Sequence, residues 1–202
     1  MENIKSILAE LRKMKNIALI LIFVGLVLFS YKPLITKVVE KKINDPVKED
    51  INNNVLIQQM LNNLMIKYGA DRGYIFQFHN TIKYYDGSHR NHQSMTFEVC
   101  SNGISREAQY LQNLAVSLYP VFLQDVLLDR MNYNNIDEIK EEATKINLKN
   151  QGIKSIYITP YFKNGKFVAY IGIDFVKKEN ETQINKQEFK SITNEIGNTL
   201  ML

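Results

Sequence analysis

The chain has 202 residues, a formal net charge of +4 and a single cysteine, Cys100. One cysteine excludes an internal disulfide and any metal site built from several cysteines. Residues 1–42 carry eight Lys or Arg and three Asp or Glu, whereas residues 43–202 carry seventeen and eighteen. Because the basic excess lies in the first part of the chain, the remainder is not a basic nucleic-acid surface, and we expect no nucleic-acid partner.

The first predicted element is a membrane-spanning helix over residues 16–35. Its uncharged core, NIALILIFVGLVLFSY, runs from Asn16 to Tyr31 and covers about 24 Å as a helix, slightly less than a ~30 Å hydrocarbon layer. A buried core helix and a cleaved signal peptide are the alternatives. The stretch lacks the polar stripe of the first and the small-residue cleavage pattern of the second. The residues assigned to the span are Ile17, Leu21, Val24, Gly25, Leu28 and Tyr31.

The segments on either side of this span are basic. Residues 1–15 show apolar residues at helical spacing, which predicts an amphipathic tail on the membrane surface or the beginning of the spanning helix itself. Residues 36–50 are charged and contain Pro46, and we interpret them as a connector. Since Lys and Arg lie on both sides of the span, their distribution does not predict its orientation. We expect the lipid bilayer to be a partner of this part of the chain.

The remaining residues, 51–202, are expected to form one domain of α+β class, with an antiparallel sheet and flanking helices. Strand and helix patterns alternate along it, and Asn164-Gly165 is a strong hairpin turn. The predicted elements are a helix over 51–68, strands over 73–80 and 95–100, helices over 105–114 and 136–148, hairpin strands over 154–162 and 166–176, and a final helix over 185–202.

No catalytic motif stands out, so we expect neither an enzyme nor a bound cofactor. Residue types that bind metals cluster at His79, His89 and His92, together with Asp86. We favour the interpretation that this segment is a polar surface loop, and we assign no metal site. Asp174, at the end of a predicted strand, could face a pocket, but a lone carboxylate in such a place more often faces the surface, which is what we expect.

Two stretches, KYGADRGYIFQFHN and GIKSIYITPYFKNGKFVAYIGIDF, resemble the GAF/PAS-like sensor fold. The resemblance covers roughly residues 50–200, and in such folds one face of the sheet lines a ligand pocket. Alternation places Tyr74, Phe76 and Phe78 on one face of their strand. They are either core residues or the wall of a ligand or regulator pocket, for which Arg72, Glu98 and Arg106 are candidate polar groups.

The arrangement of the whole chain resembles the single-span holins of T-even bacteriophages. The similarity rests on Thr159-Pro160-Tyr161-Phe162, on Val168-Ala169-Tyr170-Ile171-Gly172 and on the helix from Asn185. This resemblance implies an inner-membrane protein with a periplasmic domain that forms homo-oligomeric holes for timed host lysis under an antiholin-like regulator. The alternative is a membrane-tethered GAF-like module that binds a small ligand or a partner protein.

Overall fold

The computed structural model describes residues 15–17, 19, 21–27, 29–32, 45–84, 86–133, 135–177 and 184–200. It divides into two compact units, residues 1–49 and residues 50–202, which are described separately here. Most of the predicted tail and connector, and Leu28 of the predicted span, lie outside the described residues.

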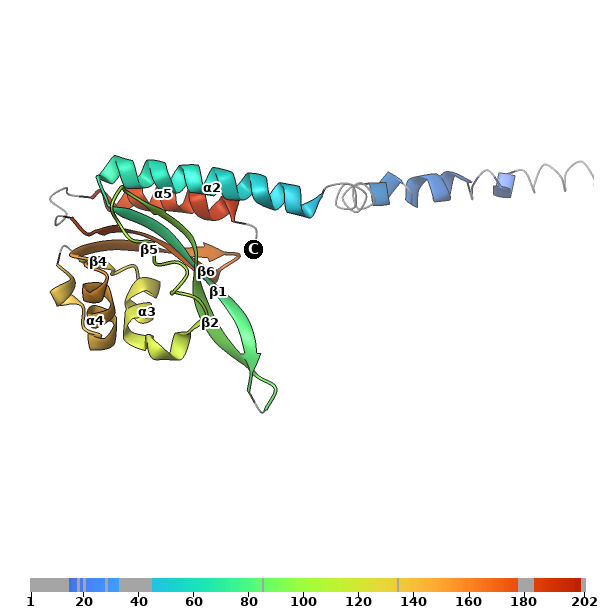
Figure 1. The fold of residues 1–202 in the computed structure, drawn as a ribbon. Helices are drawn as coiled ribbons and strands as arrows, with labels where there is room; N and C mark the ends of the chain where they lie inside the picture. Colours follow the sequence, from blue (N-terminus) through green and yellow to red (C-terminus); the bar gives the residue numbers. More distant parts are fainter. Residues whose placement is uncertain are drawn as a thin grey trace, which may run out of the picture. The chain divides into compact units, whose positions relative to one another are not determined.

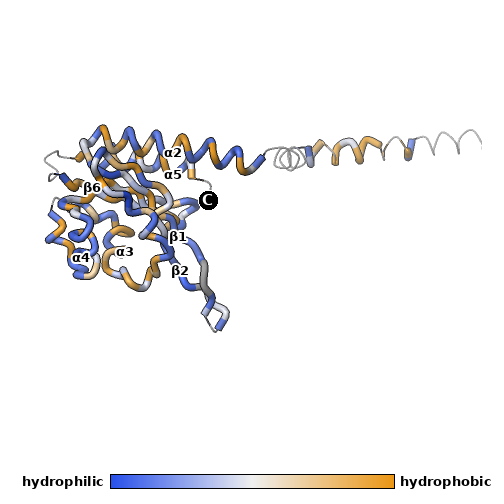
Figure 2. The backbone as a smooth tube through the Cα atoms, viewed as in Figure 1, coloured by the Kyte–Doolittle hydropathy of each residue, from blue (hydrophilic) through white to orange (hydrophobic). Residues whose placement is uncertain are grey.

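The first unit contains a helix over Lys15–Lys32 that is long and apolar enough to cross a membrane, judged by length and composition. Ile17, Leu21, Val24 and Tyr31 are all exposed on it, and Figure 2 shows the hydrophobic character of its described residues. A signal sequence satisfies the same criteria, but a soluble core helix would normally be buried, and none of the described part of this one is.

Helix α2 (Pro46–Tyr68) begins five residues before the predicted start, because Pro46 starts the helix instead of breaking a connector. Proline is well suited to a first helical turn, since its φ is already helical and its missing N–H would have no partner there. The Asp45 carboxylate accepts from the backbone N–H of Val47 at 3.0 Å, which caps the helix. The helix ends at Gly69, which has a φ of 64°, as the sequence predicts.

Six antiparallel strands form one sheet in the order β3-β2-β1-β6-β5-β4 (Figure 1). The strands are β1 (Arg72–Lys83), β2 (His89–Cys100), β3 (Leu114–Ala115), β4 (Asn132–Tyr133), β5 (Ser155–Lys163) and β6 (Lys166–Phe175). The hairpin of β5 and β6 forms at the predicted turn, where Asn164 and Gly165 have φ of 52° and 74°.

Helices cover both faces of this sheet. Helices α2 and α5 (Lys186–Thr199) lie on one face, and α3 (Pro120–Leu127) and α4 (Glu142–Asn150) lie on the other, as Figure 1 shows. Each face has its own apolar core. Ile75 packs beneath α2 and α5, whereas its neighbours Tyr74 and Phe76 point to the α3 and α4 side, as strand alternation requires. The predicted α+β class is confirmed, with helices on both faces of the sheet.

The segment between β2 and α4 differs most from the prediction. Residues 105–113 form turns instead of a helix, followed by the short η1 (Val116–Leu118) and by α3, which was not predicted. The predicted helix over 136–148 is divided into η2 (Ile136–Glu138) and α4. The turns at 105–113 have a tertiary cause: the backbone N–H groups of Glu107 and Ala108 donate to the Glu98 carboxylate.

Candidate functional site

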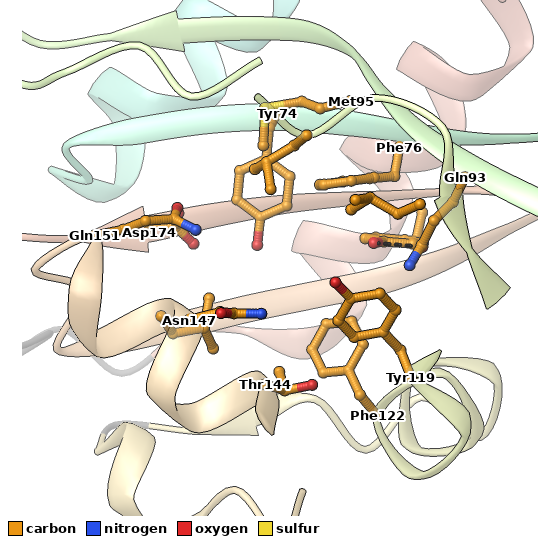
Figure 3. Close-up of a pocket in the computed structure, with 14 residues that line it drawn as sticks. Tyr74, Phe76, Gln93, Met95, Tyr119, Phe122, Thr144, Asn147, Gln151 and Asp174 are labelled. Carbon is orange, nitrogen blue, oxygen red and sulfur yellow. Dashed lines mark hydrogen bonds between the residues drawn. The ribbon is translucent and has the colours of Figure 1, made fainter. Parts of the chain in front are cut away.

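A cavity of about 70 Å³ lies between the sheet and the layer formed by α3, α4 and the segment leading into α3. Strands β1, β2 and β6 supply its floor through Tyr74, Phe76, Gln93, Met95, Tyr170 and Asp174. Tyr119, Phe122, Thr144, Asn147 and Gln151 close it from the other side, and Figure 3 shows these residues surrounding the space. Asn147 is exposed and Tyr119 is half-buried, so the cavity reaches the surface at this rim.

Aromatic rings form most of the floor. Phe76 stacks on Tyr170 with ring centroids 4.9 Å apart, and Tyr74 meets Phe76 edge-on at 6.0 Å. Gly172 makes this packing possible, because a Cβ there would lie 2.7 Å from the Cζ atom of Tyr74. Burial raises the pKa of both Tyr74 and Tyr170 well above its ordinary value, so both hydroxyls stay protonated at neutral pH. The Tyr170 hydroxyl donates to Gln93 Oε1 at 2.9 Å.

A buried ion-pair cluster lies at one end of the cavity. Arg72 is fully buried, and its Nε lies 3.1 Å from Glu98 Oε1 while its Nη1 lies 3.2 Å from Asp174 Oδ2. Arg72 also donates to Gln151 Oε1 at 3.2 Å and to the Ser105 carbonyl at 3.1 Å. These contacts connect β1, β2 and β6 with Ser105 in the segment after β2 and with Gln151 at the end of α4.

Asp174 is the member of this cluster that reaches the cavity. Its side chain is buried, and Oδ1 has no hydrogen-bond partner among the described residues. Burial raises the pKa of Asp174 to about 6, against the opposing effects of Arg72 and of the nearby Tyr74 hydroxyl. The Tyr74 hydroxyl is close enough to influence this pKa but does not meet hydrogen-bond geometry with Oδ1. The expectation that Asp174 faces the surface is wrong.

The pocket residues predicted from the sequence fall into four groups. Tyr74 and Phe76 line the cavity, and Arg72 and Glu98 lie behind it in the ion-pair cluster. Phe78 packs against Phe167 with ring centroids 4.7 Å apart and lines a separate, wider groove of about 660 Å³ beside α3. Arg106 is exposed and does not line the cavity.

Sequence reasoning missed Tyr170 and Gln93 as cavity residues, and it favoured the surface over a pocket for Asp174. A signal for two of them was present. In β6, Tyr170, Gly172 and Asp174 alternate with the residues that pack beneath α5, so they share one face of the sheet. Tyr119 and Asn147 come from segments whose approach to the sheet is a tertiary feature, and no local pattern indicates it.

The histidines lie in the β1–β2 hairpin instead of a surface loop. Strand β1 ends later in the chain than predicted, and β2 begins earlier, so both strands include histidines. His92 is buried and lies opposite His79, with ring centroids 6.1 Å apart. His79 Nε2 lies 2.7 Å from Ser94 Oγ, and burial together with His92 lowers its pKa. Within the described part of the chain, no group of three or more His, Cys, Asp or Glu residues is placed to hold a metal ion.

The solved structures most relevant to this arrangement are GAF domains. The blue-light absorbing form of the Thermosynechococcus elongatus PixJ GAF domain superposes with a TM-score of 0.55 at 11% identity, covering 76% of this chain and 84% of that chain. The GAF domain region of a putative membrane protein from Geobacter sulfurreducens PCA gives 0.53 at 12% identity, covering 76% and 95%. The chain has a GAF-like fold.

A third similar structure is the NreA protein of Staphylococcus aureus, mutated in its nitrate binding site. It superposes with a TM-score of 0.52 at 10% identity, covering 69% of this chain and 94% of that chain. At these identities the likeness establishes the fold alone. The sequence matches no family model and no curated protein.

Proposed function

We propose that this protein is a membrane-tethered GAF-like sensory module that binds a small ligand in the cavity beside Asp174. The observation that carries the proposal is the unpartnered, buried Oδ1 of Asp174 at the edge of an aromatic cavity. A buried polar atom without a partner costs stability, so its presence in a cavity wall calls for an explanation, and a bound ligand that donates to it is the one we propose. The candidate membrane helix Lys15–Lys32 supplies the tether in this proposal.

The proposal assigns binding and no catalysis to the cavity. The described cavity wall combines aromatic rings, amides and one carboxylate. This combination is typical of ligand sites, in which a few placed polar groups orient an otherwise apolar contact. The GAF-like fold is compatible with such a role but does not select it.

A cavity-blocking variant tests this function. In Gly172→Ala the new methyl group would overlap the Tyr74 ring and Ile158 on the cavity side of the sheet, and we expect this overlap to distort the cavity wall. We expect compounds from a small-molecule library that raise the Tm of the full-length protein in nanodiscs to lose that effect in Gly172→Ala. Thermal unfolding followed by circular dichroism measures the shift.

Gly73→Ala is the matched control, because its added methyl group would contact Val99 and the Leu61 carbonyl on the opposite face of the sheet. Ligands should stabilise Gly73→Ala as much as they stabilise the unmodified protein. A library without any stabilising compound, or stabilisation that survives in Gly172→Ala, would contradict a ligand site in this cavity.

The alternative function, a phage-type holin with an antiholin-like partner, rests on the chain layout and on the helix over Lys15–Lys32. It predicts sudden loss of membrane potential after a silent delay when the full chain is induced in bacteria, and no such loss for a chain without residues 1–31. Continued growth with the protein in the membrane would reject it for that host. Homo-oligomerisation, an inner-membrane location and a periplasmic domain remain parts of this alternative.

A further inference from the structure

The charges around Asp174 do not balance. Arg72 forms ion pairs with three carboxylates, those of Glu98, Asp174 and, at 4.0 Å, Glu107. The side chains of Glu98 and Asp174 are each only 3% exposed, so water screens neither charge well. One guanidinium therefore neutralises at most one of two buried carboxylates, and the cluster keeps an excess negative charge when both are ionised.

The two buried carboxylates differ in how they are satisfied. Glu98 accepts from the N–H of Glu107 at 2.9 Å and from the N–H of Ala108 at 3.2 Å, in addition to its pairing with Arg72. Asp174 accepts from Arg72 through Oδ2, whereas Oδ1 has no partner with hydrogen-bond geometry within the described chain, and the Tyr74 hydroxyl is a nearby donor outside that geometry. The uncompensated charge is thus located on the carboxylate that lines the cavity.

The rest of the cavity wall suits a positive charge. Among the described residues that line it there is no Lys, Arg or His, and Asp174 is its one charged side chain. The rings of Tyr74, Phe76 and Tyr170 line the same cavity as the carboxylate, and aromatic faces attract cations. An anion would meet the charge of Asp174 without a compensating cation in this wall.

We propose that the cavity binds a small organic cation, such as a protonated amine, whose N–H group donates to Asp174 Oδ1 while its apolar part lies against the aromatic floor. This inference rests on the proposed ligand-binding function and adds the chemical class of the ligand. The cavity volume of about 70 Å³ restricts the buried part of the ligand to a few non-hydrogen atoms.

Three probes of similar size and different charge test the inference: isobutylamine, isobutanol and isobutyrate. The full-length protein, labelled with ¹³C at its methionine methyl groups, is titrated in phosphatidylcholine nanodiscs at neutral pH. Met95 lines the cavity and reports binding, whereas Met60 and Met65 belong to the core on the other face of the sheet and serve as internal controls. We expect isobutylamine to shift the Met95 resonance with an affinity at least about tenfold higher than isobutanol, and isobutyrate to leave it unchanged.

Asp174→Asn should weaken isobutylamine binding to the level of isobutanol and leave isobutanol unaffected. Glu107→Gln is the matched control, because it removes a carboxylate from the same cluster without changing the cavity wall, and it should keep amine binding within about twofold. Equal binding of amine and alcohol, tighter binding of isobutyrate, or undiminished amine binding in Asp174→Asn would overturn the cationic ligand while leaving the cavity as a ligand site. A Met95 resonance that responds to none of the probes would overturn the cationic ligand. If, in addition, no library compound raised the Tm of the full-length protein, the ligand site itself would be overturned.

Discussion

Asp71 and Asp174 lie where β1 and β6 meet, and the surroundings of each side chain shift their pKa values in opposite directions. Burial alone would raise the pKa of Asp71, but hydrogen bonds from the N–H groups of Lys177 and Val176 and from the Ser101 hydroxyl lower it below its usual range. Asp71 is thus stabilised as a carboxylate and fastens the end of β6 to the start of β1. Among the described residues, Asp174 accepts with hydrogen-bond geometry from Arg72 alone, and burial leaves it strained as a carboxylate, which is common at binding sites.

The stability of the domain should therefore respond to Asp174 in a pH-dependent way. Its folded pKa of about 6 exceeds the usual value of 3.8, so the folded state holds this proton more tightly than the unfolded chain does. The stabilisation is present below about pH 4, is lost as pH rises to about 6, and its loss is complete above that. Asp174→Asn removes this dependence and can retain an acceptor for Arg72.

We expect Asp174→Asn to raise the free energy of unfolding relative to the unmodified protein more at pH 7.5 than at pH 5, by on the order of 1–2 kcal/mol. Urea denaturation at both pH values measures the difference. Asp137→Asn, at an exposed carboxylate outside the cavity whose pKa is lowered by its ion pair with Lys149, provides a comparison whose effect should change little over this range. An identical effect of Asp174→Asn at both pH values would show that Asp174 is not strained as proposed.

Helix α5 illustrates at the scale of an element how one small residue determines packing. A Cβ at Gly197 would overlap the ring of Tyr161, whose hydroxyl donates to Asn198 of the same helix at 2.9 Å. Alanine is preferred over glycine inside helices by about 1 kcal/mol, so propensity alone predicts that Gly197→Ala stabilises the protein. The overlap with Tyr161 opposes this gain.

We predict that steric overlap outweighs propensity and that Gly197→Ala lowers the free energy of unfolding by about 1–3 kcal/mol. Chemical denaturation of the two proteins measures the change. Ser191→Ala, at an exposed position of the same helix, should be neutral within about 0.5 kcal/mol. A stabilising effect of Gly197→Ala would mean that α5 does not pack this closely on β5.

The elements that the sequence predicts correctly have local causes. The Asn164-Gly165 turn has the backbone that its residues favour, and Asn185 caps α5 by accepting from the N–H groups of Gln187 and Glu188. The failed helix over 105–114 has a distant cause, since Glu98 binds the N–H groups of Glu107 and Ala108. A single sequence does not reveal that the Glu98 side chain replaces the helical hydrogen bonds of these N–H groups, because β2 and the segment after it come together only in the folded domain.

The same distinction applies to the candidate site. Alternation within β1 places Tyr74 and Phe76 on the cavity side, and the same rule applied to β6 would have placed Asp174 with Tyr170. Glu98 accepts from two backbone N–H groups behind the cavity, whereas Asp174 Oδ1 has no such partner among the described residues, and this difference depends on which donors each carboxylate meets. Sequence periodicity identifies the shared face but not the donors.

At the scale of the whole molecule, the proposed tethered function requires that the helix over Lys15–Lys32 holds the protein in a membrane. A charge at its centre costs about 2.5–3.5 kcal/mol on insertion scales, so Val24→Arg should reduce the fraction that resists alkaline extraction from membranes. Val24→Leu should behave like the unmodified protein. Equal extraction resistance of Val24→Arg and Val24→Leu would argue against an anchor at this segment.

The central claim is that the cavity beside Asp174 is a ligand site, and the Met95 methyl resonance tests it most directly. Met95 lies in the wall of the cavity and is only 3% exposed, so a compound that enters should change its chemical environment. We predict that a small-molecule library contains compounds that shift the Met95 resonance of the full-length protein but not those of Met60 and Met65, and that Gly172→Ala abolishes these shifts. A Met95 resonance that no compound moves, or that moves equally in Gly172→Ala, would contradict the account.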